Sequence, residues 1–179
     1  MNLVQIETRD RELQAAIASA SVESERRSGN WLVCRVGCTP CCHGPFEITP
    51  LDEWRLRRGL AEADPARARV LRGRAAEFLS QLENSEDEDE IPCPALDPVA
   101  GSCDLYDYRP VVCRVFGPAV VREDGSIATC ELCYESATEE QIAACAVEMD
   151  PQGLEAQLLE QFPEAPAEPK FVAHVLAGR

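Results

Sequence analysis

Aromatic residues and basic charge are both scarce in this chain. Only 6% of its 179 residues are aromatic although 45% are hydrophobic, so a core would be built mainly from Ala, Val and Leu. With few large anchors, metal or disulfide cross-links would add useful stability. The 17 basic residues face 32 acidic ones, for a net charge of −15. Such a surface repels polyanions, so we expect no binding to nucleic acid or to an anionic membrane.

The sequence also lacks a basic start followed by an apolar run, and therefore shows no signal peptide. No stretch approaches the roughly 20 apolar residues of a membrane-spanning helix. Together these absences predict a cytoplasmic protein, in a compartment where thiols stay reduced. With only 2 histidines, and no nucleophile–base pair, phosphate loop or hydrolytic triad, conventional acid–base chemistry has few candidates. Whether the chain is an enzyme is left open.

Cysteine, in contrast, is abundant, with 10 residues. In a reducing compartment this abundance favours metal ligation over structural disulfides. The tenth in the chain, Cys145, lies on a predicted helix beside two alanines, and we expect it to be a small buried hydrophobic residue. The other nine fall in loop-like sequence and are the predicted metal ligands. They are Cys34, Cys38, Cys41, Cys42, Cys93, Cys103, Cys113, Cys130 and Cys133.

The length fits a single domain over residues 1–179, with a cysteine-cluster metal-binding region at 34–133. Glycine and proline divide that region into loops. A small β-hairpin is predicted around 118–130, where Asp124-Gly125 gives a turn signal. We therefore expect a mostly α fold with an irregular, metal-stapled, cysteine-rich middle. Apolar residues at helical spacing predict the flanking helices. These span residues 7–28, 49–84 and 136–162.

The ends of these helices carry recognisable signals. Gly29-Asn30 would end the first helix, and Thr49 followed by Pro50 would begin the next. Pro65 would begin a further helix within the second region, with Val70 on its apolar side.

The first cysteine block reads C-x3-C-x2-C-C over residues 34–42. In a helical turn, Cys34, Cys38 and Cys41 would lie at i, i+4 and i+7 on one face, so three thiolates could converge on one centre. Cys42 would be rotated away by about 100°. It would have to serve a second metal, a different atom of a polynuclear cluster, or a core position.

The spacings bear on the choice of metal. Two C-x2-C pairs, Cys38–Cys41 and Cys130–Cys133, could together form one four-thiolate zinc site, which would leave the other predicted ligands unused. A cubane cluster presents several irons, and three close thiolates plus one distant cysteine is its familiar ligation pattern. The C-x3-C-x2-C spacing also occurs in radical S-adenosylmethionine enzymes, but the strand–helix repeats of their barrel are missing here.

Further cysteines lie in a segment that also contains Arg109-Pro110 and Arg114. These guanidinium groups could favour the thiolate form of nearby cysteines, or they could pair with the abundant surface acids. Both readings stay open. The pair Cys130-x-x-Cys133 could also be a redox-active dithiol, but it lacks the preceding strand and following helix of a thioredoxin-type site.

The segments CRVGCTPCC and CPALDPVAGSCDLYDYRPVVCRVFG together resemble the YkgJ-type cysteine-cluster family, described as a zinc- or iron-chelating domain. A related domain occurs in flagellin N-methylases. The resemblance covers about residues 34–133. It implies metal chelation by the cysteines, with zinc or iron unsettled, and implies little about a reaction. The matching residues are Cys34, Cys38, Cys41, Cys42, Cys93-Pro94, Cys103, Tyr106, Arg109-Pro110 and Cys113-Arg114.

Three further features have simple interpretations. His43 follows the cysteine pair and could be a ligand, although a role in loop packing or beside the ligands is favoured. His174 reads as a surface or packing residue. The run SEDEDE at 85–90 is predicted to be a solvated acidic loop, with a hard-cation site as the alternative. The proline-rich segment PEAPAEPK at 163–170 is predicted to be extended.

Taken together, the sequence predicts a metal-chelating cysteine-cluster protein that binds an iron–sulfur centre of the 4Fe-4S type, with a redox or accessory role. The alternative is a zinc-binding structural or interaction module without catalysis, whose helices bind a protein partner of unknown identity.

Overall fold

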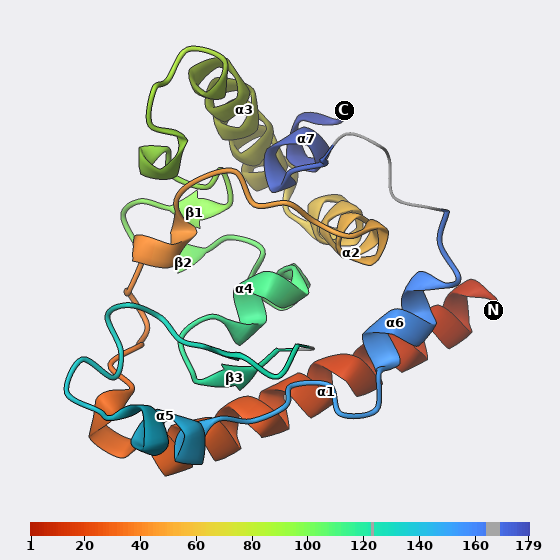
Figure 1. The fold of residues 1–179 in the computed structure, drawn as a ribbon. Helices are drawn as coiled ribbons and strands as arrows, with labels where there is room; N and C mark the ends of the chain where they lie inside the picture. Colours follow the sequence, from red (N-terminus) through yellow and green to blue (C-terminus); the bar gives the residue numbers. More distant parts are fainter. Residues whose placement is uncertain (123, 164–168) are drawn as a thin grey trace. The chain divides into compact units, whose positions relative to one another are not determined.

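The computed structural model describes residues 1–122, 124–163 and 169–179 (Figure 1). It is mostly helical, with two small antiparallel hairpins and a cysteine-rich middle, which confirms the predicted fold class. The chain forms two compact units, each assembled from two segments. Unit 1 comprises Met1–Arg35 and Val112–Phe162, and unit 2 comprises Val36–Val111 and Pro163–Arg179. The prediction of a single domain stays a prediction.

Unit 1 is organised along the helix α1, Leu3–Ser28. The helix begins four residues before the predicted start, because the Asn2 side chain accepts a hydrogen bond from the Gln5 amide and caps it. It ends where predicted, since Gly29 leaves the helix with a φ of 51°. Leu13 and Ile17 form its buried stripe.

Shorter elements pack along α1 within unit 1. The sequence between 136 and 162 predicts two successive helices, and the structure has two there, α5 and α6, which both contact α1. The predicted hairpin is confirmed as the pair β3 and β4. The bounds are α5 Glu139–Cys145, α6 Leu154–Leu159, β3 Val120–Val121 and β4 Ile127–Ala128.

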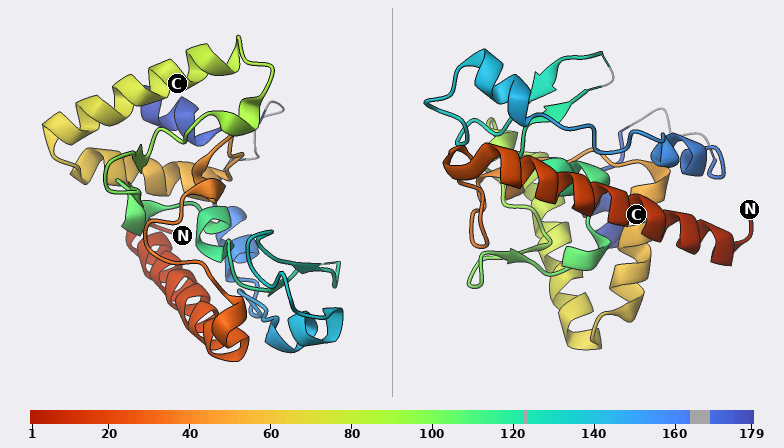
Figure 2. Two further views of the ribbon diagram at one scale, coloured as in Figure 1. Left: turned by 90° about the vertical axis from the view of Figure 1, so that its left-hand side faces the viewer. Right: turned by 90° about the horizontal axis from the view of Figure 1, so that it is seen from below.

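Unit 2 contains two longer helices, α2 (Pro50–Glu62) and α3 (Pro65–Leu82). Both start as predicted: Thr49 caps α2 with Pro50 in its first turn, and Pro65 opens α3. The short C-terminal helix α7, Val172–Ala177, packs against both (Figures 1 and 2). The sequence did not predict α7, because six residues are too few to show a clear period.

The irregular middle of the chain contains the remaining regular elements, which the sequence did not predict. An antiparallel pair in unit 2 brings Leu96 opposite Cys103. The bounds are β1 Leu96–Asp97, β2 Ser102–Cys103 and α4 Val111–Val115, with single 3₁₀ turns at Gly29–Trp31, Pro40–Cys42, Glu88–Glu90 and Tyr106–Tyr108.

Val70 does not lie where the sequence predicts. Val70 is 48% exposed rather than part of the apolar side of α3, whereas its neighbour Leu71 is fully buried. The proline-rich segment at 163–170 lies largely outside the described residues. Within the part of the chain that the structure describes, no helix combines the length and the apolar character that a bilayer crossing requires.

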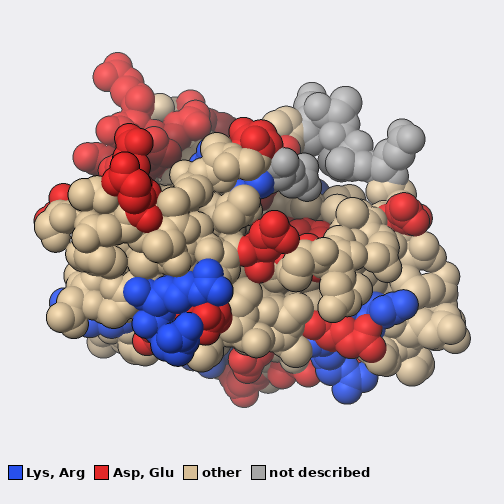
Figure 3. All heavy atoms as spheres, turned by 60° about the horizontal axis from the view of Figure 1, so that its bottom comes forward, with Lys and Arg blue, Asp and Glu red and all other residues tan. Residues whose placement is uncertain are grey.

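Several exposed charged side chains pair with a neighbour on the same helix. Arg26 and Arg27 both bond Glu23 on α1, and Arg57 bonds Glu53 on α2. On the face drawn in Figure 3, basic side chains lie beside acidic ones, and a crowded group of acidic side chains has few basic neighbours. The excess of acid known from composition is therefore unevenly distributed on this face.

Candidate metal centre

The first cysteine block does not form the helical turn considered from its spacing. No helix covers residues 32–39, because Gly37 turns the chain with a φ of 88°. Only the 3₁₀ turn at Pro40–Cys42 is helical in this stretch. The i, i+4, i+7 argument therefore does not apply, and the block is divided: Cys34 belongs to unit 1 and Cys38 to unit 2.

In unit 2, the adjacent cysteines lie beside a distant segment of the chain. The Cys93 amide donates to the Cys42 carbonyl oxygen at 2.8 Å, and the Gly44 amide donates to the Ile91 carbonyl oxygen at 2.7 Å. A β-bridge between His43 and Pro92 lies between these two bonds. The backbone thus fixes Cys42 next to Cys93, although 51 positions separate them in the sequence numbering.

The hairpin of unit 2 adds Cys103 to this arrangement. The Leu96 amide donates to the Cys93 carbonyl oxygen at 2.9 Å, and Leu96 pairs with Cys103 across the hairpin. Both cysteines are half-buried and pack against the same hydrophobic core. Burial, with a smaller contribution from the neighbouring Cys103 sulfur, raises the pKa of the Cys93 thiol to about 12.

A close backbone contact brings the loop around Cys38 to the same hairpin. A Cβ atom on Gly101 would lie 3.3 Å from the Gly37 Cα atom and 3.7 Å from the Thr39 methyl group. Gly101 also has a φ of 61°, so a side chain there would be strained as well as crowded. The residues on either side of Cys38 therefore lie against the turn that precedes Cys103.

The adjacent pair Cys41-Cys42 is itself in contact. The pKa of the Cys41 thiol is raised well above its usual range. The larger cause is the hydrogen bond between the two side chains, and the smaller cause is burial. The nearby Arg109 charge acts in the opposite direction and lowers it. Arg109 is held in place by Tyr106: its guanidinium carbon lies 3.7 Å from the ring centroid, and its Nε donates to the Tyr106 carbonyl oxygen at 3.1 Å.

His43 lies beside this pair and contacts the backbone of its turn. Its Nδ1 atom is 3.1 Å from the Thr39 carbonyl oxygen, which also accepts a hydrogen bond from the Cys42 amide at 2.8 Å. This contact packs the ring against the loop, while the predicted role in loop packing or beside the ligands stays a prediction. His174 is half-buried, and its Nδ1 accepts a hydrogen bond from the Phe171 amide at the start of α7.

Unit 1 contains a second group of cysteines. The Cys133 amide donates to the Cys130 carbonyl oxygen at 2.9 Å, forming a tight C-x2-C turn. Burial raises the pKa of the Cys133 thiol and Cys130 raises it further, while hydrogen bonds from the Val33 and Cys34 backbone lower it. The start of the first block and the C-x2-C turn therefore meet at the Cys133 sulfur.

Two special backbone positions hold this second group. A Cβ atom on Gly117 would lie 3.1 Å from the Cys34 sulfur, and Gly117 has a φ of 112°. Tyr134, directly after Cys133, has a φ of 64°, a left-handed conformation that costs a non-glycine residue about 1–3 kcal/mol. The strain is offset by the hydrogen bond from the Tyr134 amide to the Trp31 carbonyl oxygen.

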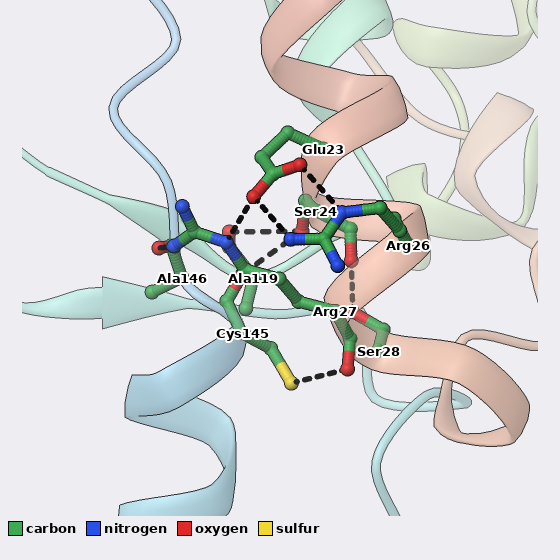
Figure 4. A network of polar contacts seen from close by, with 8 residues as sticks. All are labelled: Glu23, Ser24, Arg26, Arg27, Ser28, Ala119, Cys145 and Ala146. Carbon is green, nitrogen blue, oxygen red and sulfur yellow. Dashed lines mark hydrogen bonds and ion pairs between the residues drawn. The ribbon is translucent and has the colours of Figure 1, made fainter.

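The last two cysteines have different surroundings. Cys113 is half-buried on α4 and belongs to unit 1. Cys145 is 2% exposed and packs in the hydrophobic core of unit 1, as predicted. Its thiol donates a weak hydrogen bond to the Arg27 carbonyl oxygen of α1 at 3.5 Å (Figure 4).

The chemistry of these residues fits the predicted metals. The chain has ten cysteines, and thiolate sulfur is the ligand that zinc and iron–sulfur clusters select. Within the described residues, no three side chains of His, Cys, Asp or Glu are already grouped as the ligands of one metal ion. The predicted ligand set stays a prediction, divided by the structure into Cys38, Cys41, Cys42, Cys93 and Cys103 in unit 2, and Cys34, Cys113, Cys130 and Cys133 in unit 1.

Reasoning from the sequence missed one residue that supports the site. Asp52 is 2% exposed, and its Oδ1 accepts hydrogen bonds from Arg55 at 2.7 Å and from the Val111 amide at 3.0 Å. It thereby fixes the chain just after Arg109-Pro110. Its position three residues after the capping Thr49 is a recognisable signal for a helix start, but not for this long-range contact.

Comparison with known proteins agrees with this picture. A family model named CxxCxxCC, described as a "Putative zinc- or iron-chelating domain", matches residues 33–148. Neither the curated proteins nor the solved structures gave a match to this chain. The matched range contains all ten cysteines and more than half of the chain. The chain therefore belongs to the CxxCxxCC family of zinc- or iron-chelating domains.

Proposed function

We propose that this protein binds an iron–sulfur centre of the 4Fe-4S type through the cysteines of unit 2, and that it has a redox or accessory role. The observation that carries the proposal is the interlocking of three loops by main-chain bonds. These bonds bring Cys42, Cys93 and Cys103 to neighbouring segments of one unit.

The adjacent pair supports a polynuclear centre over a single ion. Cys41 and Cys42 are consecutive residues, and consecutive side chains diverge too much to bind one small ion easily. A cubane offers a separate iron to each thiolate. Cys38, Cys41, Cys42, Cys93 and Cys103 together provide more than the four thiolates that such a cluster needs.

Charge balance supports the same assignment. Several thiolates and a cluster bring negative charge into a protein that already carries a net charge of −15. The guanidinium of Arg109 favours ionisation of Cys41, and its stacking on Tyr106 holds it there. Because the pKa values of Cys41 and Cys93 are raised, metal uptake at neutral pH must displace protons from these thiols.

The test is the metal and sulfide content of protein purified without oxygen from cells supplied with both iron and zinc. We expect brown protein that absorbs at about 400 nm and contains acid-labile sulfide. Cys93→Ser should remove most of the iron, because it removes one ligand from the proposed centre. Cys145→Ala is the matched control, since Cys145 lies in the hydrophobic core, and it should retain the iron. Colourless protein that contains zinc and no sulfide would overturn the proposal.

Zinc is the second candidate, and one observation in unit 1 favours it. The C-x2-C turn of Cys130 and Cys133, with backbone amides directed at the Cys133 sulfur, has the form of a structural zinc knuckle. Cys34 lies beside it. Zinc that is lost from Cys130→Ser but retained in Cys93→Ser would assign this metal to unit 1.

A further inference from the structure

A cavity of about 270 Å³ opens in unit 2 between α3 and the chain from Ile91 to Pro98. Its walls are largely apolar, and Cys93 is one of the residues that line it. Phe78 and Ile91 are 3% and 5% exposed and belong to one core cluster, so this wall is firmly packed. The apolar lining residues are Phe78, Ile91, Pro92, Pro94, Leu96 and Pro98.

The size of the cavity limits what it can hold. Small-molecule sites commonly measure about 300–1,000 Å³, so this cavity is smaller than a typical cofactor pocket. One aliphatic or aromatic side chain is a better match for apolar walls of this size. Such a side chain would be one part of a longer ligand bound outside the cavity.

The lining of the cavity contains one basic and one acidic residue. The basic one, Arg74, bonds the Asp104 carboxylate at 2.8 Å and the Leu96 carbonyl oxygen at 2.9 Å, and Arg67 bonds the same carboxylate at 2.8 Å. Glu77 lies on the α3 side of the cavity, and Gln81 donates to it. No further lining residue carries a charge.

The acidic segment 83–90 connects the two sides of this cavity. Gln81 precedes it and Ile91 follows it, and both residues line the cavity. Every residue of the segment is exposed. Its acidic side chains therefore lie in solvent beside an apolar hole. They are Glu83, Glu86, Asp87, Glu88, Asp89 and Glu90.

We propose that this cavity is the anchor point for a basic peptide segment of a partner protein. One aliphatic or aromatic side chain of the partner enters the cavity, and flanking Lys and Arg residues pair with the acidic segment 83–90. Apolar burial provides affinity and the opposite charges provide rapid, specific encounter. The proposal does not depend on which metal the cysteines bind, although it places the partner next to Cys93.

The test is fluorescence anisotropy with a labelled nonapeptide of alternating Lys and Arg that has one central Phe. Titrations use the metal-containing protein at low and at physiological ionic strength. We expect replacement of Phe by Gly to weaken binding by about 10- to 100-fold, because the anchor is lost. Replacement of all Lys and Arg by Glu should abolish binding, and added salt should weaken it.

Two matched pairs of variants locate the site. Gln81→Trp narrows the cavity and should weaken binding of the Phe peptide. Ser80→Trp changes an exposed neighbour outside the cavity and should leave that binding unchanged. The triple variant Glu86→Gln, Asp87→Asn, Glu88→Gln should weaken binding by about tenfold at low salt. A control triple that removes equal charge from exposed positions of unit 1 should change it less than about twofold. That control carries Glu25→Gln, Glu148→Gln and Glu160→Gln.

Specific outcomes overturn the proposal. Equal binding of the Phe and Gly peptides would show that charge alone attracts the peptide. Equal effects of the two triple variants would show that the net charge, not the segment 83–90, is recognised. Unchanged affinity in Gln81→Trp, with an unchanged thermal midpoint, would exclude the cavity itself. Metal content is measured for each variant so that metal loss does not account for the change.

Discussion

The two units hold their cysteine-bearing loops with different buried polar groups. Unit 2 uses an ion pair: Asp52 and Arg55 are 2% and 1% exposed, and their side chains meet at 2.7 Å. The same carboxylate accepts the Val111 amide, and its other oxygen accepts the Thr49 hydroxyl at 3.0 Å. One buried charge pair therefore fixes both the start of α2 and the chain that follows Arg109.

Unit 1 uses neutral hydroxyl groups for the same purpose. Ser28 on α1 and Tyr134 after the C-x2-C turn share a hydrogen bond of 2.6 Å, and the Ala119 amide donates to the same phenol oxygen at 3.0 Å. Ser24 donates to the Cys145 carbonyl oxygen at 3.2 Å (Figure 4). These bonds connect α1 to the segments around Cys133.

The difference has an energetic consequence. Removing one partner of a buried ion pair leaves an uncompensated charge, which costs about 3–5 kcal/mol. Removing a neutral hydroxyl leaves a buried donor or acceptor unsatisfied, which costs about 1–3 kcal/mol. A single substitution of these buried polar groups should therefore lower the free energy of unfolding more in unit 2 than in unit 1.

The largest expected effect is that of Asp52→Ala. We expect the free energy of unfolding to fall by about 3–5 kcal/mol, because Arg55 would be buried without its carboxylate. Urea unfolding at constant metal content measures it. Thr49→Ala, which removes the cap and the hydroxyl bond to Asp52 but keeps the ion pair, should cost about 1 kcal/mol. Pairing Asp52→Leu with Arg55→Met should recover much of the loss. A cost of Asp52→Ala no larger than that of Thr49→Ala would contradict the comparison.

A smaller effect is expected for Tyr134→Phe in unit 1. It removes the hydroxyl that joins Ser28 to the Ala119 amide, and we expect a loss of about 1–3 kcal/mol in the same unfolding experiment. Tyr106→Phe is the control, because Tyr106 is 57% exposed, and a surface change of this kind should stay within about 0.5 kcal/mol. If the two Phe variants have equal stability, the hydroxyl network does not hold the turn.

The smallest effect concerns acid stability at the exposed end of α1. Hydrogen bonds from Arg26 and Arg27 lower the pKa of Glu23 from 4.5 to about 2. A lowered folded-state pKa stabilises above the unfolded value, so this contribution is lost as pH falls from 4.5 towards 2. In Glu23→Gln, the free energy of unfolding should depend less on pH in that window than in the wild type. Added salt should reduce this difference between the two proteins. Glu25→Gln is the charge-matched control on the same helix; identical acid curves for wild type and Glu23→Gln would count against the pairing.

Several elements could be predicted from the sequence because their signals are local. Gly29 ends α1, Thr49 and Pro50 begin α2, and Pro65 begins α3, each through a cap or a fixed φ within a few residues. The burial of Cys145 followed from its alanine neighbours on a helix. The short helix α7 had no such signal, since packing against α2 and α3 stabilises it.

The sequence by itself determined the chemistry of this protein: a surplus of thiols over histidines, in a spacing that membership in the zinc- or iron-chelating family confirms. Only the tertiary structure decided which cysteines share a unit. Cys34 and Cys38 are close in sequence but belong to different units, while Cys42 and Cys93 are far apart and lie side by side. The physical reason is that Gly37 turns the chain between Cys34 and Cys38, whereas a main-chain hydrogen bond joins Cys42 to Cys93. The spacing of cysteines along the sequence contains no information about either feature.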